Sequence, residues 1–139
     1  MGNSCRSQMA EAFARHKYAN LIEPQSAGTH PAAIVQGDTI NCMKEKGIPL
    51  QGQYPKPFRA VDWKKVDLLV NMTGAPVLGR LPKFKGGNLM WIVPDPIGKP
   101  TKVYRQVRDQ IEGLVDGLAR TLEKQRFQPK EPKGPTRKT

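Results

Sequence analysis

The first residues of the chain join a small, polar segment to the start of an amphipathic helix. Residues 2–7 read Gly-Asn-Ser-Cys-Arg-Ser and continue directly into residues 8–16, whose apolar positions recur at helical spacing. A segment of this composition can turn successive backbone N–H groups inward, and a helix N-terminus adds partial positive charge. The natural ligand of such a loop is a tetrahedral oxyanion. The forked guanidinium of Arg6 can bind two oxygens of that anion.

Hydrophobic spacing predicts three helices, over residues 7–17, 32–46 and 101–126. Ser4 or Ser7 can cap the first helix, and Gly47 is placed to end the second. The third has the clearest pattern, because apolar residues recur three and four positions apart along most of its length.

Two continuous apolar runs, residues 66–72 and 89–93, predict strands covered on both faces, and residues 21–22 predict a shorter one. Strands that alternate with helices indicate an α/β fold with a parallel sheet flanked by helices. In such sheets ligands bind beyond the carboxyl ends of the strands. We therefore expect Met72, residues 94–96 and the loop at residues 2–7 to converge there.

Length and composition indicate one ordinary globular domain, which we place at residues 1–126. The chain has 139 residues, 37% of them hydrophobic, and no apolar run approaches the length of a membrane span. Cys5 and Cys42 have no spacing typical of a disulfide framework or a zinc site, and neither His16 nor His30 stands at metal spacing. We expect a cytoplasmic protein with no metal, no cofactor and no membrane partner.

The chain is strongly basic. It carries 23 Lys and Arg against 12 Asp and Glu, a net charge of +11 that attracts anions over long range. Much of the excess lies in residues 124–138, and three prolines and a glycine exclude a helix within residues 127–139. We interpret this segment as a disordered, solvated tail in preference to a nucleic-acid-binding arm.

Three motifs in the expected order resemble the low-molecular-weight protein tyrosine phosphatase family, which includes arsenate reductases. Residues 2–15, Gly-Asn-Ser-Cys-Arg-Ser-Gln-Met-Ala-Glu-Ala-Phe-Ala-Arg, resemble that family's phosphate-binding loop and first helix. The Ser-Ala-Gly-Thr of residues 26–29 resembles the family's second conserved stretch. Asp95-Pro96 resembles the Asp-Pro dipeptide that the family carries late in its sequence. The resemblance extends from Gly2 to about Arg126 and implies a four-stranded parallel sheet flanked by helices.

The resemblance also implies roles for particular residues. Arg6 corresponds to the arginine that binds the oxyanion and stabilises the transition state, Asp95 to the acid that protonates the leaving oxygen, and Ser7 to a hydroxyl that bonds the nucleophile. Asn3 corresponds to the residue that holds the shape of the loop. The expected oxyanion-binding residues are Gly2, Asn3, Ser4, Cys5 and Arg6, with phosphate, sulfate or arsenate as the ligand.

The family's nucleophile is a cysteine thiolate at the start of a C-x5-R loop, and counting back from Arg6 places it one position before Met1. The central first strand that carries it would also lie before Met1. Cys5 stands beside the arginine on the loop wall, and we interpret it as a packed thiol. Two alternatives follow: the true start lies upstream and supplies a strand that ends in Cys, or the chain is a truncated relative that closes its sheet by rearrangement, strand exchange or homo-oligomerisation. For the 139-residue chain itself we expect no phosphatase turnover.

Several functions remain open at this point. The leading one is phosphomonoester hydrolysis with a restored nucleophile, and the others are arsenate reduction with small thiols and phosphate binding without catalysis. Ile97-Gly98 follows the Asp-Pro where phosphotyrosine-active members usually carry aromatic residues. Residues 73–87 lack the cysteine pair of thioredoxin-coupled arsenate reductases.

Overall fold

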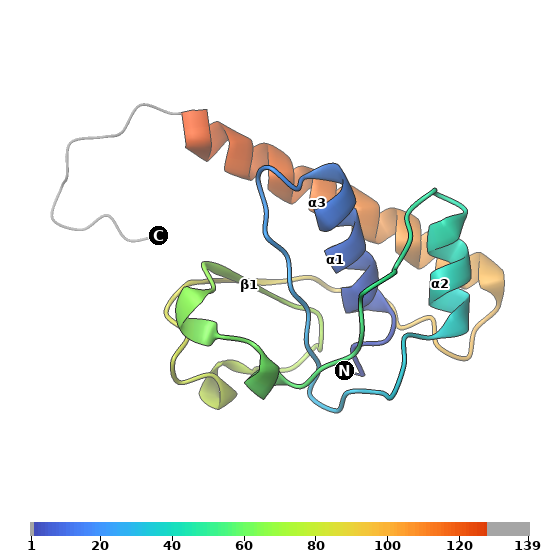
Figure 1. Cartoon of the computed structure of the whole chain (residues 1–139), viewed down its shortest axis with the longest axis horizontal. Coiled ribbons are helices and arrows are strands. Elements are labelled where there is room, and N and C mark those ends of the chain that lie inside the picture. Colours follow the sequence, from blue (N-terminus) through green and yellow to red (C-terminus); the bar gives the residue numbers. More distant parts are fainter. Residues whose placement is uncertain (1, 128–139) are drawn as a thin grey trace, which may run out of the picture.

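The computed structural model describes residues 2–127, which form three α-helices and a two-stranded parallel sheet (Figure 1). The helices are α1 (Arg6–Lys17), α2 (Gly37–Lys44) and α3 (Thr101–Phe127), and the strands are β1 (Leu68–Asn71) and β2 (Gly87–Met90). Three short 3-10 helices, Phe58–Ala60, Trp63–Lys65 and Leu78–Arg80, lie in the loops around the strands. The prediction for residues 127–139 falls outside the described residues from position 128 onward.

The helices pack on one another through α3, which contacts both α1 and α2 (Figure 1). Its residues Val107, Ile111 and Val115 recur four positions apart and are almost fully buried. They meet Met9 and Phe13 of α1 in one apolar cluster that also includes Met43 of α2. The predicted helix at residues 101–126 is confirmed, and it ends one residue later.

Helix α1 begins at Arg6, and the expectation that a serine caps it is wrong. Cys5 holds the N-cap position, and no side chain donates or accepts a capping hydrogen bond there. The Ser7 hydroxyl lies inside the first turn, where its Oγ accepts a hydrogen bond from Asn3. No side chain therefore accepts a hydrogen bond from the first N–H groups of the helix.

Helix α2 is shorter than the predicted span of residues 32–46. The preceding backbone bonds to the N-terminal loop: the Ala32 amide donates to the Gly2 carbonyl and the Gln36 amide to the Ser4 carbonyl, at 2.8 and 3.1 Å. These bonds are incompatible with a helix over residues 32–36. The helix ends at Lys44 with Glu45 as its C-cap, so the prediction that Gly47 caps it is wrong. Gly47 lies in the turn that follows, with a φ of 72° that favours glycine.

The sheet is parallel as predicted, with register from Leu68 opposite Gly87 to Asn71 opposite Met90. The expected coverage of both faces is wrong, because Leu89 and Met90 are 39% and 49% exposed. The helices pack mainly on each other, and β1 lies to one side of them (Figure 1). The described part of the chain contains two of the four strands that the resemblance implied.

The predicted strand at residues 21–22 is also wrong. The amides of Leu21 and Ile22 both donate to the Tyr18 carbonyl, in a turn that follows α1. A strand needs a neighbour at hydrogen-bonding distance, and a cavity separates this segment from β1. Beyond it, Gly28 forms a single parallel bridge with Pro57. Within residues 2–127, none of the helices has the length and apolar character needed to cross a bilayer.

An ion-pair cluster fastens the end of α2 to α3. Arg105 and Arg108 both bond the carboxylate of Glu45, at 2.8 Å each, and Arg108 Nη1 also donates to the Cys42 carbonyl. Hydrogen bonds from Arg105 and Arg108 lower the pKa of Glu45 from 4.5 to about 2. The carboxylate is therefore charged in the folded chain well below the pH at which it protonates in the unfolded chain.

We expect Glu45→Gln to lower the thermal midpoint at neutral pH. A depressed pKa stabilises the fold above the unfolded-state value, and this contribution is lost as pH falls toward the folded-state value. The difference between wild type and variant should thus shrink between pH 4.5 and about 2 in melts followed by circular dichroism. Glu123→Gln, an exposed carboxylate on α3, is the control. A difference in thermal midpoint that stays constant over this pH range would contradict the ion pairing of Glu45 with Arg105 and Arg108.

Candidate functional site

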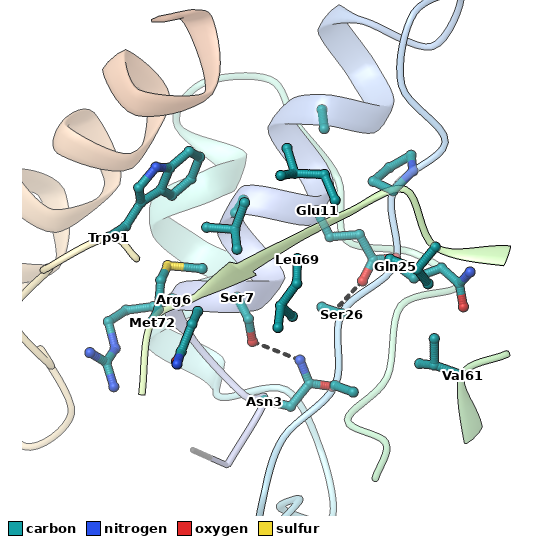
Figure 2. A pocket seen from close by; sticks show the side chains of 18 of the residues that line it. Asn3, Arg6, Ser7, Glu11, Gln25, Ser26, Val61, Leu69, Met72 and Trp91 are labelled. Atoms are coloured by element: carbon teal, nitrogen blue, oxygen red, sulfur yellow. Dashed lines mark hydrogen bonds between the residues drawn. The ribbon is translucent and has the colours of Figure 1, made fainter. Parts of the chain in front are cut away.

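A cavity of about 630 Å³ opens between the N-terminal loop, residues 21–27 and β1 (Figure 2). All of the predicted site residues line it: Gly2, Asn3, Ser4, Cys5, Arg6, Ser7 and Asp95. Met72 lines it as well, so the convergence expected from the sequence is present. The carboxyl end of β1 and the N-terminus of α1 meet at the same cavity.

Asn3 fixes the shape of the loop. It is 2% exposed and has a φ of 55°, the left-handed conformation that asparagine tolerates better than most residues. Its Nδ2 donates to Ser7 Oγ at 2.7 Å, and its Oδ1 accepts from the Lys56 amide at 2.9 Å. Figure 2 shows the Asn3 and Ser7 side chains pointing toward each other. The two ends of the loop are thereby tied together.

The loop carbonyls and the loop amides differ in their partners. The carbonyls of Gly2, Asn3 and Ser4 accept hydrogen bonds from Ala32, from Gln8 and from Gln36. Within residues 2–127 the backbone N–H groups of residues 3–7 donate to no backbone or side-chain acceptor. Five neighbouring donors beside a cavity and at a helix N-terminus form a site suited to an anion.

Arg6 and Asp95 line the cavity from two segments that are far apart in the sequence. Arg6 Nη1 donates to the Val93 carbonyl at 2.8 Å, and Figure 2 shows its side chain extending away from Asn3 and Ser7. Asp95 lies two residues beyond Val93, is exposed, and accepts a hydrogen bond from the Ile97 amide at 3.0 Å. The structure therefore brings Arg6 to the segment that carries Asp95, with the guanidinium turned aside from the loop amides.

Both cysteines are buried thiols. Cys5 is 3% exposed and Cys42 is 1% exposed, and neither forms a disulfide. Burial raises the pKa of each thiol from 9.0 to about 11. At neutral pH both are protonated, so neither is the reactive thiolate that nucleophilic catalysis needs.

Sequence reasoning missed the residues that support the loop from behind. Gln8 is fully buried, its Nε2 donates to the Asn3 carbonyl, and its Oε1 accepts from Gln53 at 2.8 Å. Gln53 and Lys56 belong to the stretch of residues 49–58, which contains three prolines and no predicted helix or strand. A glutamine at position 8 gives no sign in the sequence that it is buried or that Gln53 is its partner.

Other polar residues lie away from the loop. Among residues 2–127 no group of three or more His, Cys, Asp or Glu side chains is arranged to hold a metal ion. His16 is exposed and its Nε2 lies 3.2 Å from the Pro49 carbonyl, whereas His30 contacts Thr29. Glu11 at the cavity wall bonds the hydroxyl of Ser26 and pairs with Arg15.

The chain was compared with known protein families. A family-wide sequence model described as low molecular weight phosphotyrosine protein phosphatase matches residues 1–128. The chain belongs to this family. The resemblance drawn from the three motifs is thus confirmed over most of the chain.

Relatives of this phosphatase-family chain carry two different names. A glutaredoxin arsenate reductase of Synechocystis sp. is 33% identical over 123 residues, which cover 84% of this chain and 88% of the relative. A protein-arginine-phosphatase of Geobacillus stearothermophilus is 32% identical over 140 residues, covering 88% and 91% of the two chains. The family relationship therefore spans a reductase and a phosphatase at equal similarity.

Solved structures agree with the fold of this phosphatase-family chain. An arsenate reductase in the phosphate binding state superposes with a TM-score of 0.77 at 30% identity, over 86% of this chain and 92% of the other. An arginine phosphatase from Geobacillus stearothermophilus gives a TM-score of 0.78 at 29% identity, over 91% of each chain.

Proposed function

We propose that residues 2–7 bind a tetrahedral oxyanion, phosphate or arsenate, and that this binding is the basis of the chain's function. The observation that carries the proposal is the set of unpaired amides at residues 3–7, whose neighbouring carbonyls all have partners. A related structure in a phosphate binding state supports the same class of ligand. The net charge of +11 also favours anion capture.

The chemistry that we propose for this loop is hydrolysis of phosphomonoesters. A thiolate would attack phosphorus, the leaving oxygen would take a proton from Asp95, and water would then cleave the thiophosphate. Arg6 would release the Val93 carbonyl and turn its guanidinium onto the oxyanion. Ser7 Oγ accepts from Asn3, which leaves its O–H free to donate into the cavity.

Neither described thiol fits the attacking role, because Cys5 and Cys42 are buried and protonated at neutral pH. We therefore expect the 139-residue polypeptide to bind oxyanions without turning over a phosphoester. A steady release of phosphate from p-nitrophenyl phosphate by this polypeptide, abolished in Arg6→Ala, would contradict that expectation.

Arsenate reduction is the second candidate, favoured by the reductases among the relatives. Two small thiols would supply two electrons, forming one disulfide as arsenate becomes arsenite. Arsenate-dependent oxidation of glutathione, with no release of phosphate from p-nitrophenyl phosphate, would select this candidate over hydrolysis.

Isothermal titration with inorganic phosphate tests the binding proposal. We expect saturable binding by the wild-type polypeptide and at least about tenfold weaker binding by Arg6→Ala, since a charge-assisted hydrogen bond contributes about 1.5–3 kcal/mol. Arg59→Ala, which removes an exposed arginine outside this cavity, is the matched control. Equal affinity in wild type and Arg6→Ala would refute the role given to Arg6.

A further inference from the structure

Strand β2 has a free edge on the side that faces away from β1. The Trp91 amide donates to the Asn71 carbonyl of β1 at 3.0 Å. Because backbone groups of successive strand residues point to opposite edges, those of Asn88 and Met90 face away from β1. Among residues 2–127, β2 has β1 as its one strand neighbour. The outward amides and carbonyls of Asn88 and Met90 therefore have no strand to pair with.

The side chains along this edge are mostly apolar and exposed. Leu89, Met90 and Ile92 are 39%, 49% and 74% exposed, and the sequence of residues 86–94 contains no charged side chain. Exposed strand edges usually carry a charged residue, a proline or a bulge that prevents pairing with another chain. Helix α3 covers only the end of this edge, where Gln110 Nε2 donates to the Ile92 carbonyl at 3.2 Å. The rest of the edge is open to a further strand.

The charges near this edge are positive. Four exposed lysines flank the apolar strip in the sequence: Lys83 and Lys85 before β2, and Lys99 and Lys102 after it. In the part of the chain that the structure describes, none of their ammonium groups forms a hydrogen bond or an ion pair. Across residues 68–108 the sequence has Asp95 as its one acidic residue. The edge therefore combines an apolar strip with unpaired positive charge at its ends.

These charges decide which occupant complements the edge. Pairing of β2 with β2 of a second copy would bring both sets of unpaired lysines together, in chains that each carry a net charge of +11. The sequence of residues 128–139 has four basic residues against one acidic residue, and three prolines that cannot donate to a ladder. Like charge thus opposes both of these occupants. An apolar strand with acidic residues at its ends complements the strip and the lysines together.

We propose that the free edge of β2 binds an extended segment of a separate partner protein, with about four to five apolar residues between acidic ones, which adds to the sheet as a third strand. The segment pairs with the outward backbone groups of Asn88 and Met90. Its apolar side chains pack on Met90 and Ile92, and its carboxylates approach the flanking lysines. None of these three residues lines the anion cavity, so the inference does not rest on the proposed function.

Titration with two synthetic peptides tests the proposal. Both contain a run of alternating valine and isoleucine, flanked at each end by glutamates in one peptide and by lysines in the other. We expect saturable binding of the glutamate peptide to the 139-residue polypeptide. The lysine peptide should bind at least about tenfold more weakly, because repulsion replaces attraction at both ends. Exchange of the amide protons of Asn88 and Met90 should slow in the complex, since both become paired.

Substitutions on β2 provide the second arm. Asn88→Pro removes an outward amide and leaves the bonds between β1 and β2 in place, because an edge strand tolerates proline where its N–H would face solvent. We expect this variant to lose peptide binding and Asn88→Ala, which keeps the amide, to bind like the wild type. Met90→Lys should also abolish binding, whereas Ile40→Lys, at a position on α2 that is 41% exposed, should not. If Asn88→Pro fails to fold, amide exchange and Met90→Lys still decide the question.

Four results would overturn the proposal. They are the absence of saturable binding, equal binding of the two peptides, unchanged binding by Asn88→Pro, and a dimer in light scattering that Met90→Lys abolishes. The third would place the peptide elsewhere on the molecule, and the fourth would assign the edge to a second copy. Each is distinguishable from failure of the proposed function, because phosphate titration reads the anion loop separately.

Discussion

Ile111→Ala is expected to lower the free energy of unfolding by about 2–5 kcal/mol, a large fraction of the stability of a single domain. Ile111 is fully buried on α3 and belongs to the cluster that joins Met9 and Phe13 of α1 to Met43 of α2. Truncation removes apolar contacts to two helices and leaves a cavity that close packing cannot fill. Urea unfolding followed by circular dichroism measures the change.

Ile34→Ala is the matched control for this substitution. The same atoms are removed from a side chain that is 73% exposed, so we expect a change within about 0.5 kcal/mol. If the two variants lose equal stability, the apolar cluster between α1 and α3 does not form the core of the molecule.

Asn3→Ala is expected to lower the free energy of unfolding by about 2–4 kcal/mol and to abolish phosphate binding. The substitution leaves the part-buried Lys56 amide without its acceptor and Ser7 without its donor, and a group left unsatisfied by burial costs about 1–3 kcal/mol. Alanine also tolerates the φ of 55° less well than asparagine. Both losses act on the loop that carries the unpaired amides.

Two further substitutions separate the effect of the lost hydrogen bonds from that of the backbone conformation. Asn3→Gly relieves the backbone conformation and loses both side-chain bonds, while Asn3→Asp keeps the acceptor for Lys56 and puts a negative charge at the anion site. We expect Asn3→Asp to be the more stable of the two and still to bind no phosphate. Asn20→Ala, at an exposed position, should change neither property. Phosphate affinity retained in Asn3→Ala would show that the loop does not depend on Asn3.

The elements that could be predicted from the sequence are those set by local pattern. Helix α3 follows from its apolar period, the turn at Gly47 from the lack of a side chain, and the parallel pair β1–β2 from two apolar runs separated by a connection. The convergence of residues 2–7, Met72 and Asp95 at one cavity followed from the rule that parallel strands present their carboxyl ends together.

The wrong secondary-structure predictions arise where long-range hydrogen bonds override the local propensity of the sequence. Residues 32–36 have helical composition, yet two of their amides bond the carbonyls of the N-terminal loop. Leu21 and Ile22 have strand propensity, yet their amides turn back to Tyr18. Neither partner is visible in a local window of sequence.

In the candidate site, too, features set by a local pattern could be predicted and features set by long-range contacts could not. Residues 2–7 were predicted from the N-terminal motif, because a Gly/Asn/Ser segment before a helix is typical of an anion site, and Asp95 was predicted from its resemblance to the family's Asp-Pro. The hydrogen bond from Arg6 to Val93 and those from Gln53 to Gln8 were not predicted, since they join positions more than 40 residues apart.

The placement of the two tryptophans has a practical consequence. Trp63 packs edge-on against Phe58 and Phe84, and Trp91 follows β2. Both indoles border the cavity, and Trp91 also packs against the apolar cluster of the helices. The intrinsic fluorescence of the protein is therefore an optical reporter of events at that opening. Emission from Trp63 reports on what enters the cavity, whereas emission from Trp91 also responds to rearrangement among the helices.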